Sequence, residues 1–408
     1  MSENQIITYH TLSNGLRIVH RQVQSDVEYC GVAVNVGSRD EVAGQYGLAH
    51  FVEHTIFKGT RKRRSSHIIN RMETIGGELN AYTTKEETML YSVFPKGNLL
   101  RAVELIADLV ANSQFPDIEL DKEREVVADE INSYLDSPAE AIFDDFDDLL
   151  FADSQLGHNI LGTEESLAGF TSKVCREYLS KYYIPSNMVF YYMGASTDEV
   201  VLKTVERNFK ALLPQEYSLE RIVPKEIQPF DIKRQIGSHQ AHSIIGAKLP
   251  GMYSAMRYPI ALFANILGGP GMNSLLNVAL RERRGLVYTV DASLSMFTDV
   301  GALMIYFGCD PADVKRCRRL INNQLDRLAS SSMSDKAVDA AKRQYIGQLA
   351  VASENREQVV LSIGRAMLYY GSVSSYNDSV ARIKAITPEQ LREIAQRVAS
   401  SPSILTLS

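Results

Sequence analysis

The sequence predicts an α+β protein made of two homologous domains. Its 408 residues exceed the size at which one hydrophobic core keeps growing, so at least two domains are expected. The two halves also align at an offset near 212 residues, following apolar runs of strand length at residues 31–36 and 243–248. The matched positions are Tyr46, Ala49 and Phe51 in the first half and Tyr258, Ala261 and Phe263 in the second. This repeat indicates that both halves adopt the same architecture.

Within each half, runs typical of strands precede patterns typical of helices. Residues 89–94 and 302–307 are apolar runs of strand length. The segments that follow, residues 98–112 and 313–329, carry apolar side chains at three- and four-residue spacing, which is the helical period. Each domain is therefore expected to contain a sheet backed by helices.

The domain boundaries follow from a proline-containing stretch at residues 213–233, which we interpret as a linker. The first domain then covers residues 1–212 and the second covers residues 234–408. Near the end of each domain a threonine stands where a helix is expected to begin, at Thr171 and at Thr387, and threonine is a favourable capping residue. The repeat therefore extends through both domains.

The composition limits the classes of partner. With 45% hydrophobic and 23% charged residues, the chain has the composition of an ordinary folded protein rather than of a disordered one. Its net charge of −6 gives no general attraction to nucleic acid or to acidic membranes. The one basic run, Lys58 followed by residues 61–64, is interpreted as a solvated loop. We therefore expect neither a nucleic-acid partner nor a membrane partner.

Cysteine usage and the N-terminal residues favour a reducing cytoplasm. The four cysteines are far apart and form no C-x-x-C pair, so we expect buried free thiols. They are Cys30, Cys175, Cys309 and Cys317. Residues 1–7 lack a basic segment followed by an apolar core, and no apolar run is long enough to span a bilayer.

The stretch His50-Phe51-Val52-Glu53-His54 carries the chemistry. On a helix, His50 and His54 lie four residues apart and project from the same face, with Glu53 beside them. Neutral imidazole is a standard zinc ligand, and a carboxylate beside the metal can take a proton from the water that zinc activates. The motif therefore predicts a hydrolytic zinc site with Glu53 as the general base.

The second half provides an internal control for this motif. At the offset of 212, the three motif positions face Leu262, Asn265 and Ile266. The fold can therefore be built without the motif, so packing alone does not explain it. The alternative, two histidines buried and satisfied in a core, is the weaker interpretation.

A third protein ligand is needed if zinc keeps one position for water. Residues 121–132 have a helical pattern in which Glu123 and Glu130 lie seven residues apart, hence on one face. Either carboxylate could reach the metal. A glutamate-rich helix is more commonly a solvated face, and this alternative stays open on the residues alone.

The order H-x-x-E-H resembles the motif of the pitrilysin family of zinc peptidases, the inverzincins. The chain is most similar to the short-chain branch that includes mitochondrial processing peptidase and its bacterial relatives, over essentially its whole length. The resemblance implies two domains with mostly antiparallel sheets, forming half of a clamshell. It also implies one Zn²⁺ per chain, with Glu130 as the third ligand and Glu123 in a supporting role. A bacterial cytoplasmic protein is expected.

Two further segments match the family. Residues 76–83 resemble its glycine turn and edge strand, against which a substrate peptide pairs, and Asn80, Ala81 and Phe51 are expected to contact substrate. In the second domain, the resemblance implies that Arg281 holds a substrate carbonyl. It implies that Tyr288, seven residues later, donates toward the developing oxyanion.

Two segments depart from the family pattern. The family often has His-Pro and then a glycine where this chain has residues 157–163, and Pro270 interrupts a glycine-rich turn. Neither segment contains a predicted metal ligand. They affect the expected substrate preference and domain mobility.

The predicted function is that of a zinc-dependent endopeptidase that hydrolyses unfolded peptides in a closed chamber. Long family members hold four such domains and this chain holds two, so we expect a homodimer or a heterodimer with an inactive homologue. Two alternatives remain. One is a non-catalytic core-type subunit of the same fold, and the other is a maturase of one specific precursor peptide.

Overall fold

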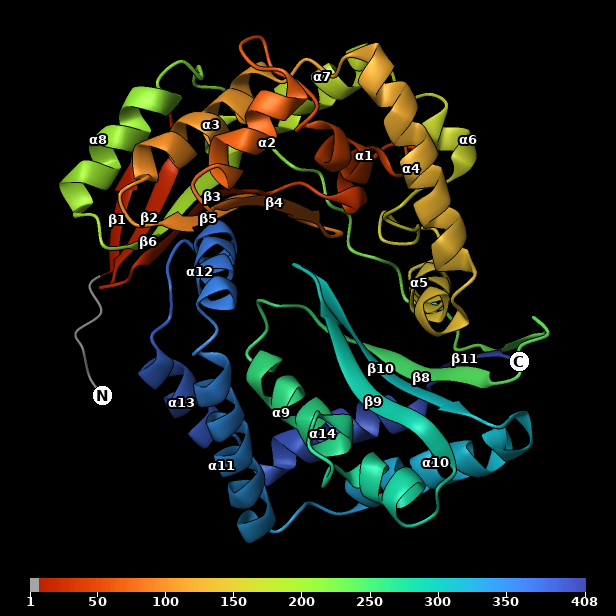
Figure 1. The fold of residues 1–408 in the computed structure, drawn as a ribbon. Helices are drawn as coiled ribbons and strands as arrows, with labels where there is room; N and C mark the ends of the chain where they lie inside the picture. The colour runs from red at the N-terminus through yellow and green to blue at the C-terminus, as the bar shows by residue number, and fades with distance from the viewer. Residues whose placement is uncertain (1–6) are drawn as a thin grey trace. The chain divides into compact units, whose positions relative to one another are not determined.

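The computed structural model describes residues 7–408, and the chain divides into two compact units (Figure 1). The first unit contains residues 7–132, 158–221 and 353–373. The second contains residues 133–157, 222–352 and 374–408. Residues 1–6, which begin the predicted first domain, lie outside the described residues.

The first unit is built on a six-stranded sheet with the order β1-β2-β6-β3-β5-β4. Its strands are β1 (Ile7–Thr11), β2 (Arg17–Gln22), β3 (Val27–Val34), β4 (Glu78–Thr83), β5 (Thr88–Pro95) and β6 (Met188–Gly194). All neighbouring strands are antiparallel except β2 and β6, which are parallel. Strand β4 therefore forms one edge of the sheet.

Helices surround this sheet. They are α1 (Leu48–Thr55), α2 (Ser65–Glu73), α3 (Leu99–Asn112), α4 (Asp117–Leu135), α6 (Glu164–Leu167), α7 (Ser172–Tyr182), α8 (Asp198–Phe209) and α12 (Arg356–Tyr370). Short 3₁₀ turns lie at Ser38–Asp40 and Pro185–Asn187. The last residues of α4 fall in the second unit.

Alternate residues of the central strands enter two different cores. Ile18 and Val32 pack into a core with α1, α3, α7 and α8, whereas Val19 and Ala33 pack against α12. Successive side chains of a strand point to opposite faces, so both faces of this sheet are covered by helices. The central strands accordingly consist of almost continuous apolar residues.

The second unit repeats the arrangement with five strands in the order β7-β11-β8-β10-β9. Its strands are β7 (Asp231–Arg234), β8 (Ala241–Pro250), β9 (Val287–Met296), β10 (Val300–Cys309) and β11 (Ser403–Leu407). Its helices are α5 (Pro138–Leu150), α9 (Arg257–Gly268), α10 (Val314–Ser330), α11 (Asp335–Ala352), α13 (Tyr376–Lys384) and α14 (Pro388–Ser400), with short turns at Asn277–Glu282 and Pro311–Asp313. Only β7 and β11 pair in parallel. The predicted mostly antiparallel sheets backed by helices are confirmed.

The compact units differ from the predicted boundaries in two segments. Helix α12 comes from the second half of the chain but covers one face of the first sheet, as Figure 1 shows. Helix α5 comes from the first half but places Ile142, Phe146 and Leu150 on the second sheet. Each sheet has two apolar faces, and its own half of the chain covers only one of them with helices. The exchanged helix buries the other face.

Several local predictions are confirmed. The expected helices at residues 98–112 and 313–329 match α3 and α10 to within a residue. The hydroxyls of Thr171 and Thr387 accept backbone hydrogen bonds at the starts of α7 and α14. All four cysteines are buried free thiols. Among residues 7–408, no helix combines the length and apolar character needed to cross a lipid bilayer.

The basic run after α1 is not entirely solvated. Arg63 binds Asp108 and donates to Glu104 over 2.6 Å, and its side chain is only 15% exposed. Both acids lie on α3, so Arg63 ties the loop to the helix. The interpretation of this run as a solvated loop is wrong for Arg63, because acidic residues on another helix neutralise it.

Candidate metal centre

Helix α1 presents two faces of different chemistry. Leu48, Phe51 and Val52 are buried in the core of the first unit. His50 and His54 project from another side of the helix, and their rings lie 4.5 Å apart between centroids. The helix begins after Gly47, which has a φ of 93°, a left-handed conformation that suits glycine. The predicted helix and the shared face of its two histidines are confirmed.

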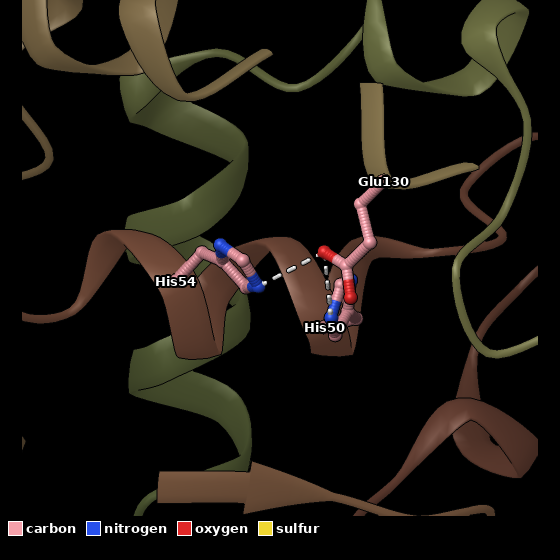
Figure 2. A group of neighbouring side chains, drawn as sticks. All are labelled: His50, His54 and Glu130. Atoms are coloured by element: carbon pink, nitrogen blue, oxygen red, sulfur yellow. Dashed lines mark ion pairs between the residues drawn. The ribbon is translucent and has the colours of Figure 1, made fainter. Parts of the chain in front are cut away.

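A carboxylate from α4 meets the two rings. One oxygen of Glu130, Oε2, lies 3.4 Å from Nε2 of His54 and 3.8 Å from Nε2 of His50. Figure 2 shows both rings and the carboxylate pointing toward one another. One ligand atom from each residue lies within 4.8 Å of the others, and no other such cluster of three occurs among residues 7–408. The three side chains could hold one metal ion.

The donor set fits zinc. Burial, assisted by the neighbouring His54, lowers the pKa of His50 to about 3, so this imidazole is neutral at physiological pH. A metal ligand must be unprotonated, and two neutral nitrogens with one carboxylate oxygen are a common zinc set. Three protein ligands leave a fourth position for water or substrate, which is typical of catalytic rather than structural zinc.

A second glutamate contacts the other ring nitrogen of His54. Oε1 of Glu123 lies 3.2 Å from Nδ1 of His54, the ring nitrogen that faces away from Glu130. The other oxygen of Glu123, Oε2, forms an ion pair with Nζ of Lys58 over 2.7 Å. A carboxylate on the far nitrogen fixes both the orientation and the tautomer of a ligating imidazole. Glu123 therefore has the geometry of a supporting residue, and its role stays a prediction.

Lys58 was not expected at the site. A solvated loop was predicted there, but the side chain of Lys58 is 28% exposed and its ammonium group holds Glu123. Lys58 lies beyond the end of α1 at Thr55, so helical periodicity does not indicate its contact with Glu123. Its ammonium group holds the oxygen of Glu123 that does not face His54.

Glu53 lies one residue before His54, at the partly exposed side of α1. Burial raises the pKa of Glu53, and hydrogen bonding with Thr83 opposes the rise. Thr83 is the last residue of β4, and α1 packs against this strand. The carboxylate is therefore held between α1 and an edge strand of the sheet, and its role as general base stays a prediction.

Strand β4 follows the predicted glycine turn, and it pairs with β5 alone among the described strands. Asn80 and Ala81 are partly exposed on it. A peptide can add as a further strand to such an edge. The substrate role of Asn80 and Ala81 stays a prediction.

Phe51 requires a correction. It was expected to contact substrate, but it is fully buried and packs against Phe170, with 5.4 Å between ring centroids. One residue after His50, a side chain on a helix points about 100° away, and here that direction is the core. Phe51 therefore anchors α1 rather than lining a substrate surface.

Arg281 and Tyr288 both lie in the second unit. Arg281 lies in the short helical turn Asn277–Glu282, and Tyr288 lies at the start of β9 with 62% of its surface exposed. Both side chains are accessible, as substrate contacts require. Their roles stay predictions.

Two family models match the chain. Residues 17–164 match "Insulinase (Peptidase family M16)", and residues 169–345 match "Peptidase M16 inactive domain". The first match contains all three candidate metal ligands, His50, His54 and Glu130. The second agrees with the absence of the motif from the second half.

Relatives match over nearly the whole chain. A protein from Streptomyces coelicolor is 31% identical, covering 95% of this chain and 86% of the relative, and carries the name uncharacterized zinc protease. The uncharacterized zinc protease YmxG of Bacillus subtilis is 30% identical, covering 98% of both proteins.

Solved structures share the fold. A protease from Helicobacter pylori superposes with a TM-score of 0.90 at 22% identity, covering 99% of both chains. A Pseudomonas fluorescens structure titled as a peptidase M16 inactive domain gives 0.91 at 17% identity, covering 98% of this chain and 97% of that one. Together with the two family models and the full-length relatives, the folds and the histidine motif establish that this chain belongs to peptidase family M16, the insulinase family.

Proposed function

We propose that this protein is a zinc-dependent endopeptidase that holds one zinc ion between His50, His54 and Glu130. The observation that carries the proposal is the convergence of these three ligand atoms within 4.8 Å, with Glu53 in the same helical turn as His54. The names of the full-length relatives, zinc proteases from several bacteria, agree with it.

Each group has a separate task in this proposal. Bound zinc would supply Lewis acidity, polarising the scissile carbonyl and acidifying water. Glu53 accepts a proton from the attacking water and delivers it to the leaving amine. Glu123 and Lys58 hold the ring of His54 in the orientation for binding. The free edge of β4 aligns the peptide beside α1, and alignment lowers the entropic part of the barrier.

The proposed substrates are unfolded peptides, because pairing with β4 requires an extended backbone. We also propose that Arg281 and Tyr288 contact the bound peptide, and that two chains associate to enclose the reaction. A homodimer and a pair with an inactive homologue both satisfy this proposal. Light scattering on active protein is expected to give the mass of two chains, and a monomer in active samples would contradict association.

Metal analysis combined with peptide hydrolysis tests the function. Purified protein is expected to contain one zinc ion per chain and to cleave a quenched fluorescent peptide in a chelator-sensitive way. A zinc-free protein without hydrolysis would instead support the non-catalytic subunit. Mass spectrometry of cleaved peptide mixtures separates a general peptidase from a maturase, since a maturase would cut a single precursor.

The variant Glu53→Gln tests the general-base role of Glu53 separately from zinc binding. It preserves the shape of the side chain but cannot accept the proton, so kcat is expected to fall by about 100- to 10,000-fold while zinc content is unchanged. The measurement is a steady-state rate on protein whose zinc content has been determined. Near wild-type hydrolysis by the variant would remove Glu53 from the mechanism.

A further inference from the structure

The start of α1 lacks a cap from its own sequence. The first N–H groups of any helix have no partner within the helix. Here the residue at the N-cap is Gly47, which has no side chain to supply one. The N–H of Leu48 donates to the carbonyl oxygen of Gln45 over 3.1 Å, and His50 is the third residue of the helix and so lies in this first turn. The position of a proposed metal ligand therefore depends on what holds these N–H groups.

Glu41 supplies the missing partner. Its Oε2 accepts a hydrogen bond from the backbone N–H of Gly47 over 2.9 Å, and its Oε1 accepts one from Ala49 over 2.7 Å. The side chain of Glu41 is fully buried. A buried carboxylate that accepts two N–H groups at a helix start also interacts favourably with the helix dipole. It reaches α1 from outside the helix, six to eight residues earlier in the chain.

His158 holds Glu41 in place. Its Nε2 lies 3.2 Å from Oε2 of Glu41 and 2.9 Å from the backbone oxygen of Ser38. The imidazole ring stacks on Tyr46, with 4.0 Å between the ring centroids. His158 belongs to the segment 157–163 that departs from the family pattern. In this chain, that segment contacts the start of α1.

The backbone at Gly47 lies in close contact with the backbone of residues 161–162. A Cβ atom added at Gly47 would lie 2.5 Å from the backbone oxygen of Leu161, and one added at Gly162 would lie 2.2 Å from that of Tyr46. The two chain segments are therefore in direct backbone contact. Glu41 binds the N–H groups of Gly47 and Ala49, and residues 161–162 contact the backbone just before α1, so both hold the start of this helix.

The corresponding helix of the second unit begins differently. Helix α9 begins after Met256, which makes no side-chain cap, and a serine hydroxyl from Ser254 accepts the N–H of Met256. At the repeat offset of 212, Glu41 faces Tyr253. The carboxylate at the helix start thus occurs in the unit that carries the histidines and not at the matching position of the other unit.

We propose that Glu41 is a positioning residue for the metal centre, which fixes the first turn of α1 and with it the ring of His50 relative to Glu130. The inference rests on the proposed zinc site. Metal ligands must lie within a few tenths of an ångström of the coordination distance, so a frayed first turn weakens binding even when all ligands are present. The hydrogen bonds of Glu41 join it to Gly47, Ala49 and His158 rather than to the side chains of the three proposed ligands.

The variant Glu41→Gln tests this role, because an amide presents one acceptor oxygen where the carboxylate presents two. The zinc dissociation constant, measured by competition with a chromophoric chelator, is expected to rise about 10- to 100-fold. Hydrogen exchange of the amides at Ala49 and His50 is expected to accelerate in zinc-free protein. The exchange readout reports the first turn directly, independently of hydrolysis.

Glu28→Gln is the matched control. Glu28 is a buried carboxylate of the same unit that accepts from Tyr192 Oη over 2.9 Å and from the backbone N–H of Ala195 over 3.1 Å, away from α1. Its substitution is expected to lower stability with no change in zinc affinity. If Glu41→Gln fails to fold, Glu41→Asp, which keeps the charge but has a shorter reach, is expected to show the same loss to a smaller degree.

The outcomes separate the two proposals. Equal zinc affinity in Glu41→Gln and in wild type, or an equal loss in Glu28→Gln, would overturn the positioning role and leave the zinc site intact. Wild-type protein that binds no zinc would overturn the proposed function itself, and the positioning role with it.

Discussion

The two units put different chemistry on matching pairs of helices. In the first unit, α1 and α4 bring His50, His54 and Glu130 together. In the second unit, the corresponding helix α9 places Leu262 in the core, and Asn265 donates a 2.8 Å hydrogen bond to Gln348 on α11. A side-chain amide pair thus links α9 to α11 in the unit without the motif.

This difference separates the requirements of the fold from those of the site. Leu262 is fully buried, and His50 at the matching position is 8% exposed. Burying a polar atom without a partner destabilises a protein, and the buried Nδ1 of His50 has no hydrogen-bond partner among residues 7–408. The second unit shows that this helix packs well with leucine, so His50 is a residue that folding alone does not require.

The largest effect is expected from replacing His50 by its counterpart. His50→Leu removes one of three ligands, so stoichiometric zinc binding and peptide hydrolysis are both expected to be lost. In chelator, the free energy of unfolding is expected to stay the same or to rise by about 1 kcal/mol, because leucine suits the buried position. Metal analysis and urea unfolding measure the two quantities.

Two results would contradict the conclusion that His50 serves metal binding and not folding. Retention of tightly bound zinc by His50→Leu would show that this ring is not a ligand. A large loss of zinc-free stability would show that His50 has a structural task that Leu262 does not reproduce. In wild type, added zinc is expected to stabilise the fold by about 2.7 kcal/mol at 100 times the dissociation constant, and this gain should vanish in the variant.

A smaller effect is expected from the supporting carboxylate. Glu123→Gln removes the charge that faces His54 Nδ1 and Lys58 but preserves the side-chain shape, so zinc affinity is expected to fall about 10- to 100-fold. Chelator competition gives the dissociation constant. Glu104→Gln, which disturbs ion pairs with Arg63 and Arg71 on the same unit, is the control and should leave that constant unchanged. Unchanged affinity in Glu123→Gln would remove it from the site.

The smallest effect is expected in the unit without the motif. Asn265→Leu breaks the hydrogen bond to Gln348 and leaves a partly buried amide without this partner. The free energy of unfolding is expected to fall by about 1 kcal/mol, with zinc affinity and hydrolysis unchanged. Thermal or urea unfolding checks the first quantity. A change in zinc affinity would show that the second unit influences the metal site through its own helix pair.

The sequence predicted the elements better than their partners. The periods of apolar residues located α3 and α10, and the spacing of the two histidines indicated α1, because both are local properties of the chain. The exchange of α5 and α12 between the two sheets could not be predicted, since an amphipathic pattern shows that a helix has a buried face but not which sheet covers it. The compact units therefore differ from the boundaries placed in chain order.

The site shows the same distinction between local and distant contacts. His50, Glu53 and His54 could be identified from their spacing within one helix. Glu130 could not be separated from Glu123 without the family resemblance, because its contact with the rings joins distant parts of the chain. Glu41 gave no local signal, since its partners are backbone N–H groups that a sequence pattern does not reveal.

A crystal structure of the zinc-loaded protein, with the metal located by its anomalous scattering, tests the central claim most directly. We expect one zinc ion in the first unit, about 2.0–2.2 Å from Nε2 of His50, Nε2 of His54 and a carboxylate oxygen of Glu130. An ion bound elsewhere, or one that leaves Glu130 beyond bonding distance, would contradict the proposed metal centre.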